Sequence, residues 1–564
     1  MQIQPLYLSV GGLLSGRLFK VPEYQRAYSW QTKQRADLFN DIEKVFESDA
    51  DSTHFMATIV GLRRKKKRIA SDEFQEIEVV DGQQRLTTLT ILLKALSKQL
   101  KADDIRRAEE IDSLLVKGDD LALLVTNHDS NHIFADYLRD GTVPDAKSPY
   151  TSADQNIIDA IAECEKFVSV WSEQHKRKPI DLYSIIKNRL SAIFFEIEDE
   201  GVVYTVFEVL NSRGLDVTWF DRLKSLLMAV VFDSPGKSAK LDTVAELHNL
   251  WTEIYRAIGL RWQSLNKETV RFAGTLQSTS IPARPLSEED AVETLVSACK
   301  GSPRGVVDCS KWVLKVTKTE SRLLNNERIT AATRIVQARL LAVAILLRGF
   351  PESDERRLSR EWENVTFRIY GLGRFDARQK VGDYVRLAWK ITNENLKAEK
   401  VIEEIQKLGI DDEFAIRSVV KNLHNKDCYK DWSEELRYFL YRYEEYLAQK
   451  AGQTINEGMW NRIWNVDPSK SIEHIFPQSR GSDSPSTSGI YVHRLGNLIM
   501  LPPGVNSKLQ DLLPSQKAAT YATQGLLQAI EVSKLIAKGK WNRAAVKKRE
   551  KQLIRWATQE WRTH

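Results

Sequence analysis

A junction between a predicted strand and a predicted helix near residue 82 constrains the fold of this chain more than any other stretch. The segment FQEIEVV at 74–80 favours a strand, and Asp81-Gly82 closes it. The next eighteen residues, QQRLTTLTILLKALSKQL, place leucines along one helical stripe, at positions 86, 89, 93, 96 and 100. Asp81 is predicted to cap this helix, with Gln84 at N3 in a capping box. The chain is therefore expected to contain an α/β region.

A second predicted strand, HFMATIVG at 54–61, is followed by six consecutive basic residues, RRKKKR at 63–68. We expect this charged run to form a hairpin tip or a long loop between the two strands. Such a patch supplies the salt-sensitive, sequence-independent part of nucleic-acid binding, but a solvated hairpin tip explains it equally well.

Three further segments extend the predicted α/β region. AIFFEIED at 192–199 reads as a strand, and VVYTVFEVLNSRG at 202–214 reads as a helix that ends in glycine. Thr218 and Asp221 form a T-x-x-D box that opens another helix.

The chain of 564 residues is too long for one hydrophobic core. We predict an α+β, multidomain and predominantly helical protein, divided into an α/β region at 1–235, a helical scaffold at 236–435 and a C-terminal domain at 436–564. Composition is ordinary for globular proteins, with 42% hydrophobic and 28% charged residues. No apolar run approaches the ~20 residues of a membrane span, and the N-terminus lacks the features of a signal peptide.

The four cysteines are widely spaced and form no C-x-x-C pair, which argues against a disulfide scaffold and a zinc knuckle. His424 and Cys428 lie four residues apart, which is weak evidence for a metal site. A reducing cytoplasm fits this cysteine usage.

The net charge of +6 is compatible with a polyanionic partner without requiring one. A second basic segment lies at 538–556, and it begins a helix with one apolar stripe, made of Val546, Leu553, Ala557 and Trp561. We expect the stripe to pack on the C-terminal domain and leave a basic face outward, which either binds nucleic acid or is simply solvated.

The segment IEHIFPQS at 472–479 places Glu473 and His474 side by side. Taken alone, this is a polar pair at the end of a strand, exposed to solvent. Downstream, HRLGNLIML contains Asn497, and PPGVNSKLQD contains Asn506 and Lys508. The pattern predicts a strand, a loop, a second strand and a helix.

These residue types suit phosphodiester hydrolysis. The reaction needs an activated water and a cation that holds the phosphate. A neutral imidazole is a suitable general base near pH 7, and carboxylate and amide oxygens are hard ligands for Mg²⁺ or Mn²⁺.

This C-terminal segment, roughly 440–560, resembles an HNH (ββα-metal) nuclease of the kind found in GmrSD-type restriction endonucleases. The resemblance implies that His474 is the general base, that Glu473 and Asn506 are metal ligands, and that Asn497 supports the base. Lys508 is expected to touch phosphate. Asp is common where this chain has Glu473, and the longer side chain should still reach the metal. His493 is not a required member of the motif and is a weaker candidate for a place near the metal or DNA.

A second polar set lies in VPEYQRAYSW at 21–30, in DGQQR at 81–85 and in FEVLNSRGLDVTWFDRLK at 207–224. The first turn of a helix is a natural phosphate site, and arginine adds bidentate donors. Each segment taken alone also fits ordinary capping and turn chemistry. No Walker A sequence is present.

Together these segments resemble the N-terminal domain of the same family, over roughly 8–235, which is similar to ParB and sulfiredoxin domains. The resemblance implies binding and hydrolysis of GTP or another nucleoside triphosphate. The residues that it assigns to this nucleotide site are Tyr24, Gln25, Arg26, Asp81, Gly82, Gln83, Gln84, Arg85, Asn211 and Arg213.

The resemblance implies a type IV restriction endonuclease that is regulated by a nucleotide, depends on metal and cleaves modified phage DNA, such as DNA with glucosylated hydroxymethylcytosine. It implies double-stranded DNA and a nucleotide as partners, no membrane, a cytoplasmic location, and leaves a homodimer open. Three alternatives remain: a phosphorothioate-sensing nicking NTPase like SspE, a non-catalytic DNA-binding regulator, and an N-terminal domain that reads DNA without a nucleotide.

Overall fold

The computed structural model describes residues 5–23, 25–48, 54–126, 131–143, 151–198, 218–233, 237–424, 426–430, 432–480 and 491–562. The chain divides into two compact units. Unit 1 comprises Met1–Gly274 and Ser287–Lys318, and unit 2 comprises Thr275–Leu286 and Thr319–His564. The predicted helical scaffold at 236–435 contributes to both units, and the three-part division of the chain stays a prediction.

A six-stranded mixed sheet forms the centre of unit 1. Its strand order is β1-β8-β3-β4-β2-β7, where β3 pairs parallel with β8 and antiparallel with β4. The strands are β1 (Pro5–Ser9), β2 (Arg17–Val21), β3 (His54–Ile69), β4 (Asp72–Asp81), β7 (Leu123–Val125) and β8 (Leu190–Ile197). All three strands predicted from the sequence lie in this sheet. The predicted strands 54–61 and 74–80 fall within β3 and β4, and 192–199 falls within β8 except for its last two residues.

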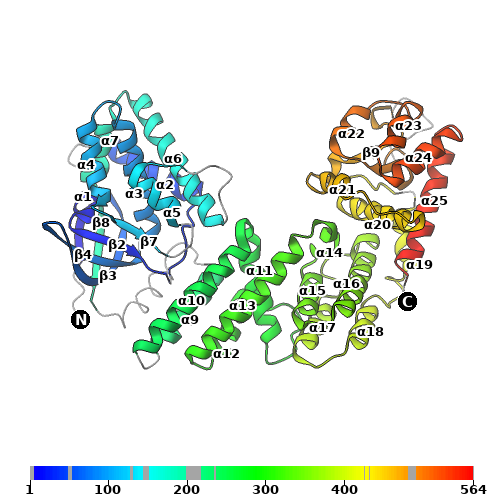
Figure 1. The fold of residues 1–564 in the computed structure, drawn as a ribbon, viewed down its shortest axis with the longest axis horizontal. Helices are drawn as coiled ribbons and strands as arrows, with labels where there is room; N and C mark the ends of the chain where they lie inside the picture. Colours follow the sequence, from blue (N-terminus) through cyan, green and yellow to red (C-terminus); the bar gives the residue numbers. More distant parts are fainter. Residues whose placement is uncertain are drawn as a thin grey trace. The chain divides into compact units, whose positions relative to one another are not determined.

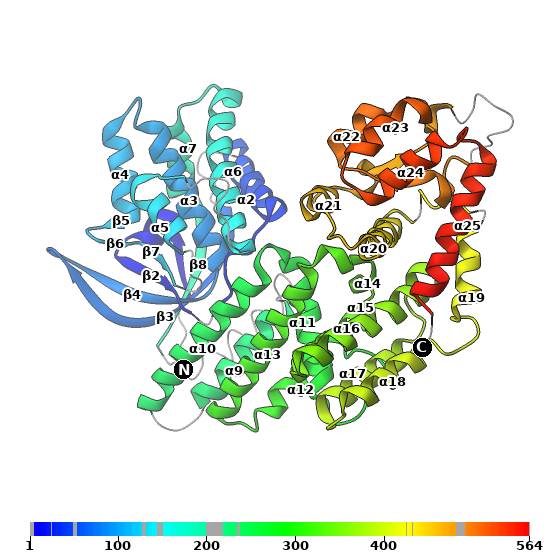
Figure 2. The same cartoon turned by 45° about the vertical axis from the view of Figure 1, so that its right-hand side comes forward.

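Helices cover one face of this sheet, as both views of unit 1 show (Figures 1 and 2). They are α1 (Val10–Leu14), α2 (Thr32–Glu47), α3 (Gln83–Leu100), α4 (Ile105–Leu115), α5 (Asn131–Asp140), α6 (Ser152–His175) and α7 (Pro179–Asn188). A small hairpin, β5 (Val116–Lys117) with β6 (Asp120–Leu121), follows α4.

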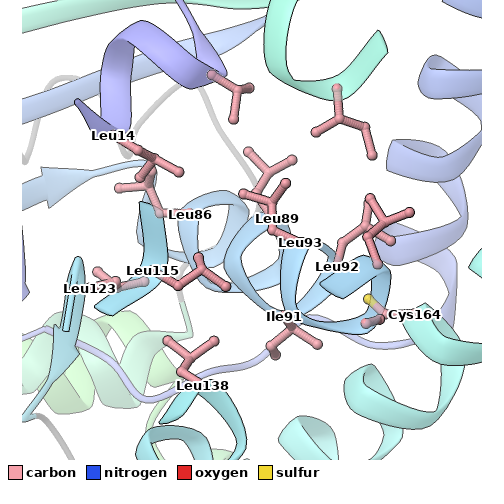
Figure 3. Packing of buried hydrophobic residues seen from close by; sticks show 14 of the residues in the cluster. Leu14, Leu86, Leu89, Ile91, Leu92, Leu93, Leu115, Leu123, Leu138 and Cys164 are labelled. Carbon is pink, nitrogen blue, oxygen red and sulfur yellow. The ribbon is translucent and has the colours of Figure 1, made fainter. Parts of the chain in front are cut away.

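The helix after Gly82 is the central helix of this layer. Its predicted leucine stripe is buried, and so is most of the rest of its surface. Figure 3 shows Leu86, Leu89, Leu92 and Leu93 packed among side chains from several other elements. Buried polar groups of α3 are satisfied, as where the Nζ of Lys94 lies 2.9 Å from Asp112 Oδ1. The helix is therefore buried on more sides than the single leucine stripe predicts.

The basic run 63–68 lies inside β3, so the prediction of a hairpin tip or loop for it was wrong. The β3–β4 hairpin extends beyond the rest of the sheet (Figure 2). Acidic side chains on neighbouring strands pair with the run, as in Arg64–Glu78 and Lys66–Glu73 at 2.8 and 3.1 Å. These cross-strand pairs make an extended strand favourable for a sequence that would repel itself in isolation.

From residue 218 onward, the described part of unit 1 is helical. They are α9 (Trp219–Asp233), α10 (Lys237–Ile258), α11 (Trp262–Gln277), α12 (Glu288–Ala298) and α13 (Pro303–Leu324), of which α11 and α13 run past the unit's bounds. The Thr218 hydroxyl accepts a hydrogen bond from the Asp221 N–H at 3.2 Å, which confirms the predicted box at the start of α9. The predicted helix at 202–214 lies outside the described residues.

Unit 2 is mostly helical and holds a two-stranded sheet. Its larger helices are α15 (Val336–Arg348), α16 (Glu352–Thr366), α17 (Val381–Asn393), α18 (Ala398–Leu408), α20 (Ser433–Ala451), α21 (Glu457–Trp464), α23 (Pro514–Thr523), α24 (Leu527–Ala537) and α25 (Arg543–Glu560). Shorter segments are α14 (Thr330–Thr333), α19 (Ile416–Val419), α22 (Pro503–Leu509), β9 (Ile472–His474) and β10 (Leu498–Met500). The predicted α+β, predominantly helical class is confirmed, whereas the ParB-like and HNH architectures stay predictions.

One hydrophobic core joins α20 and α21 to the small sheet and to α25. It is rich in tryptophan, and Trp561 packs on Phe367 with ring centroids 5.0 Å apart. Leu553, Ala557 and Trp561 of the predicted apolar stripe lie in this core, and Val546 is buried too, which confirms that the stripe packs on the C-terminal part of the chain.

Among the residues that the structure describes, no single helix is long and apolar enough to cross a membrane. Only the bent pair Glu327–Thr333 and Val336–Arg348 reaches that length and composition, and only when its two parts are combined.

Candidate functional site

The predicted order of strand, loop, strand and helix is present in unit 2. β9 pairs antiparallel with β10, with His474 opposite Leu498 and Glu473 opposite Ile499. Pro502 and Pro503 then set the start of α22, which carries Asn506. Proline suits this position because its missing N–H would have no partner in a first helical turn. The fold therefore brings residues more than thirty positions apart to one place.

Glu473, His474 and Asn506 line one cavity of about 950 Å³. Tyr429 and Lys470 also line it, together with polar residues from the loop after β9 and from α22. Asn497 and Lys508 are not among its lining residues. Three of the five residues predicted for the C-terminal site thus converge on a shared space.

The Glu473 carboxylate is held on one oxygen. Its Oε1 accepts a hydrogen bond from the Tyr521 hydroxyl at 2.6 Å and lies 2.7 Å from Lys517 Nζ. No side chain of the described residues binds its other oxygen, Oε2, although the main-chain N–H of His474 also stabilises the carboxylate. The side chain is 3% exposed, and this burial raises the pKa of Glu473, which the Lys517 ammonium opposes. One oxygen is therefore tied to the protein while the residue faces the cavity.

The His474 imidazole is neutral near pH 7. Burial, followed by the neighbouring His493 and Lys517, lowers the pKa of His474 to about 3. Its Nε2 lies 3.1 Å from Nδ1 of His493, a residue that is itself buried. The Tyr429 ring packs edge-on against His474 and stacks on His493. The ring is therefore neutral and held in one orientation, and its low pKa makes it a weak base in the protein without DNA or metal.

Asn497 is fully buried and all of its polar atoms are engaged. Its Oδ1 accepts from Phe476 N and Trp541 Nε1, and its Nδ2 donates to Phe476 O and Val492 O. The four distances lie between 2.9 and 3.1 Å. Asn497 therefore holds both ends of the loop between the strands together, behind the cavity.

The Asn506 amide is oriented by its nitrogen. Nδ2 donates to Lys470 O at 2.9 Å and to Ile472 O at 3.2 Å. Because both partners are carbonyls, the amide oxygen Oδ1 is left on the other side, and within the described residues no hydrogen bond reaches it. Lys508 lies on the same helix, is exposed, and its predicted phosphate contact stays a prediction.

The donor set fits a hard divalent cation bound with few protein ligands. Glu473 and Asn506 each have one oxygen that no described side chain binds, in residues that line the cavity, which matches the ligand preference of Mg²⁺ or Mn²⁺. Magnesium sites typically use one or two protein ligands and complete their shell with water and phosphate. Across the described part of the chain, no group of three His, Cys, Asp or Glu side chains is placed to hold a metal ion. His424 accordingly contacts Glu550, at 3.0 Å, while Cys428 is a buried free thiol.

Charged residues of α25 brace the strand pair from behind. Arg549 is buried and donates to Gly496 O at 3.0 Å and Leu498 O at 2.9 Å, on either side of Asn497. Glu550 is buried beside it and accepts from Arg494 Nε at 2.7 Å. The outward face of α25 keeps exposed basic residues, namely Lys547, Lys548, Lys551 and Arg555.

The second predicted set surrounds the start of α3 in unit 1. β4 ends at Asp81, and Gly82 caps the helix with φ 93°, in the left-handed region that favours glycine. A Cβ at Gly82 would lie 2.9 Å from Ile59 Cγ1. The strand therefore passes β3 too closely for any other residue at this turn.

The capping box predicted for Asp81 and Gln84 was wrong. Gly82 is the N-cap, and the Asp81 carboxylate accepts from the Gly82 N–H at 2.8 Å instead of from the helix's first turn. Gln84 Oε1 instead accepts from Ser29 N at 2.8 Å and Trp30 N at 3.3 Å. A contact 55 residues away in sequence outcompeted the local one.

Side-chain amides tie the segment 25–30 to this junction. Gln83 donates to Arg26 O at 3.1 Å, and Gln25 donates to Val80 O at 2.9 Å. From α9, the buried Lys224 donates to Glu23 O at 2.7 Å and Gln25 O at 3.3 Å. The predicted segments thus meet in space, with their glutamines bound to main-chain groups.

Two arginines of the set are partly exposed at this junction. Arg85 is half-buried, and its guanidinium lies over the Trp30 ring, 5.8 Å from the ring centroid. Arg26 is also half-buried and belongs to the same segment as Trp30. The first-turn N–H groups of α3 have no helical acceptor. Tyr24, Asn211 and Arg213 lie outside the described residues.

Sequence reasoning missed Lys517, Tyr521 and Lys470. Lys517 and Tyr521 lie four residues apart, on one face of α23, where both side chains are buried. That spacing was visible in the sequence, but their partners on β9 are more than forty residues away. Lys470 precedes the motif by three positions and is the only Lys or Arg among the described residues that line the cavity.

Two family models match the sequence. The first, described as the N-terminal domain of GmrSD restriction endonuclease, matches residues 10–228. The second, described as the C-terminal domain of GmrSD restriction endonucleases, matches residues 416–556 and includes the whole candidate site of unit 2. Together the two matches cover well over half of the chain. A comparison with curated proteins found no match.

Proposed function

Because the chain belongs to the GmrSD family of restriction endonucleases, we propose that it is a type IV enzyme that hydrolyses modified DNA at the cavity beside β9. The observation that supports this proposal best is the convergence of Glu473, His474 and Asn506 on that cavity. Each of the two proposed ligands has one atom held by the protein and one oxygen that no side chain of the described residues binds, which suits this oxygen to bind a cation.

The proposed roles follow from the contacts of each group. His474 accepts a proton from the attacking water, since its imidazole is neutral and its Nε2 is already oriented by His493. Lys470 lies at the edge of the cavity and binds a phosphate oxygen of the DNA backbone. Asn497 keeps His474 in register with the loop that follows it. When bound between Glu473 and Asn506, Mg²⁺ or Mn²⁺ would stabilise negative charge on the scissile phosphate.

The junction at Gly82 is proposed to bind a nucleoside triphosphate, GTP or another, that regulates cleavage. Support comes from the N–H groups at the start of α3, which have no helical acceptor, and from Arg85 and Arg26 in the same set. The glutamines of this set serve to hold the segment 25–30 in place, so the charged groups are the ones expected to contact phosphate.

The cleavage proposal is tested with purified full-length protein on plasmid and phage DNA, modified and unmodified, with Mg²⁺, Mn²⁺ or EDTA, and with or without nucleotide. We expect cleavage of modified DNA that requires metal and is abolished in His474→Ala. His132→Ala is the matched control, because His132 is exposed on α5 in unit 1. Full cleavage by His474→Ala would refute the general-base role. Single-strand nicks in phosphorothioate DNA alone would favour the SspE-like alternative, and no cleavage of any substrate would favour a regulator.

The nucleotide proposal is tested separately by measuring GTP and ATP affinity. Arg85→Ala is expected to weaken binding at least about tenfold, as loss of one charged hydrogen bond costs roughly 1.5–3 kcal/mol. Arg106→Ala on α4 is the control, since Arg106 is an exposed arginine outside the predicted site. Equal affinity in wild type and Arg85→Ala would favour a domain that reads DNA without a nucleotide.

A further inference from the structure

A buried lysine reaches both central residues of the C-terminal site from behind. Lys517 lies on α23 and its side chain is 0% exposed. Its Nζ lies 2.7 Å from Glu473 Oε1 and donates to the main-chain oxygen of His474, also at 2.7 Å. Tyr521, one turn later on the same helix, donates to the same Glu473 oxygen.

An ordinary structural ion pair does not explain this arrangement well. Burying an ammonium is costly, and replacing a buried pair by apolar residues is often neutral or stabilising. Here one ammonium contacts two consecutive residues through different atoms, a side-chain carboxylate and a main-chain carbonyl. It therefore fixes the carboxylate and the end of β9 relative to each other, which a pair of side chains alone would not do.

Both donors from α23 bind the same carboxylate oxygen. With Oε1 engaged twice, rotation of the Glu473 carboxylate would break two hydrogen bonds. Oε2 is then the oxygen that no described side chain binds, in a residue that lines the cavity. The contacts of Lys517 and Tyr521 thus determine which oxygen Glu473 offers.

We propose that Lys517 is a positioning residue for DNA cleavage, which presents Glu473 Oε2 to the cavity and holds the peptide of His474 in place. Tyr521 helps to orient the Glu473 carboxylate but does not contact the His474 peptide. The inference rests on the proposed nuclease function, because the orientation of the Glu473 carboxylate and of the His474 peptide matters for cleavage only if both residues act in that reaction. It adds a residue outside the HNH-like motif, contributed by a helix after α22.

The first test compares Lys517→Met, Tyr521→Phe and Lys534→Met in the full-length protein. Methionine keeps most of the lysine side-chain volume, and Lys534 is an exposed lysine on the adjacent α24. We expect Lys517→Met to slow cleavage by about 100-fold and to weaken Mn²⁺ affinity at least about tenfold, the range found when supporting residues of metal sites are removed. Tyr521→Phe should lose less, roughly threefold to tenfold, and Lys534→Met should match wild type.

The second test does not depend on cleavage or metal. Removal of Lys517 leaves Glu473 buried without its cation, so Lys517→Met is paired with Glu473→Gln to keep the fold intact. In metal-free protein labelled at histidine, the imidazole NMR signals of His474 should be unchanged in Glu473→Gln, where Lys517 still holds the His474 carbonyl. They should shift in Glu473→Gln with Lys517→Met.

The outcomes separate the two proposals. A wild-type protein that neither cleaves DNA nor binds Mn²⁺ refutes the proposed function, and a shift of the His474 signals would still support its positioning by Lys517. Wild-type cleavage and Mn²⁺ affinity in a folded Lys517→Met variant would overturn the inference. Unchanged His474 signals in the double variant would overturn it as well.

Discussion

The polar residues at the start of α3 in unit 1 and those around β9 in unit 2 use the same chemistry for different ends. At the start of α3, the side-chain amides of Gln25, Gln83 and Gln84 form hydrogen bonds with main-chain groups of a neighbouring segment. At β9, Glu473 and Asn506 each bind protein groups through one side-chain atom and keep one oxygen that no described side chain binds. A run of polar residues in a motif therefore mixes groups that build a site with groups that act in it. The contacts of each atom distinguish the two.

The largest effect is expected from a comparison of the two asparagines of the C-terminal site, Asn497 and Asn506. Asn497→Ala leaves four buried or partly buried donors and acceptors without their partner, so we expect a loss of about 3 kcal/mol or more in local stability together with loss of cleavage. Asn506→Ala should reduce metal-dependent cleavage by at least about 100-fold while the fold stays intact. Hydrogen exchange of peptides from β9 and β10, measured beside cleavage rates, checks both. Equal destabilisation by the two changes would remove the distinction.

The second test compares the glycine at the start of α3, Gly82, with the glycine at the start of α22, Gly504. Gly82→Ala places a Cβ against Ile59 at a left-handed φ, and we expect the stability of α3 to fall by about 3 kcal/mol. Gly504 at the start of α22 has no neighbouring atom within 4 Å of an added Cβ and an ordinary φ. Gly504→Ala should therefore be neutral or slightly stabilising. Hydrogen exchange of α3 and α22 reports each helix separately, and a stable Gly82→Ala variant would contradict the steric account.

The third test uses pH to probe the burial of His474. The unfolded chain binds a proton at His474 near pH 6.5, whereas in the fold the pKa is about 3. Between these values the unfolded state binds more protons, so the free energy of unfolding falls as pH falls, by about 2 kcal/mol from pH 7 to pH 5. His474→Asn should lose this part of the pH dependence, while His132→Asn keeps it. If the free energy of unfolding changed with pH in parallel for wild type and His474→Asn, His474 would bind its proton equally well in the folded and the unfolded chain, and the burial account would be wrong.

The smallest expected effect compares the two basic segments. Lys66 on β3 is paired with Glu73, whereas Lys551 on α25 is exposed and has no such partner among the described residues. Lys551→Ala should weaken DNA binding several-fold and lower the slope of log affinity against log salt by about 1. Lys66→Ala should leave both nearly unchanged, since its charge is already balanced. Titrations at 50 to 200 mM salt measure the slopes, and a larger change for Lys66→Ala would reverse the assignment.

Much of the fold followed from local pattern. The strand–glycine–helix junction, the strands later found within β3, β4 and β8, and the strand pair before α22 were all predicted because apolar spacing and glycine placement are local properties. The basic run 63–68 was misplaced because its stabilising partners, such as Glu73 and Glu78, lie on another strand. Charge repulsion within the run is visible in the sequence, and cross-strand neutralisation is not.

The same limit applies to the sites. The residues that line the cavity were found through the order of Glu473, His474 and Asn506. Their supports, Lys517 and Tyr521, were missed because a helix more than forty residues later delivers them. The capping box at Asp81 failed for a related reason, since Gln84 found better partners in Ser29 and Trp30. The nucleotide assignment, the metal and the roles of single residues stay predictions.

The inward-facing Arg549 of α25 has a consequence for synthesis of the chain. Arg549 holds the carbonyls on either side of Asn497, so the loop behind His474 is not secured until α25 has been made. At ordinary translation rates, the ribosome needs several seconds to go from His474 to Arg549. A nascent chain that already carries Glu473, His474 and Asn506 therefore lacks a rigid site. If the proposed function is right, the protein becomes able to cut DNA only after nearly all of the present sequence has been translated.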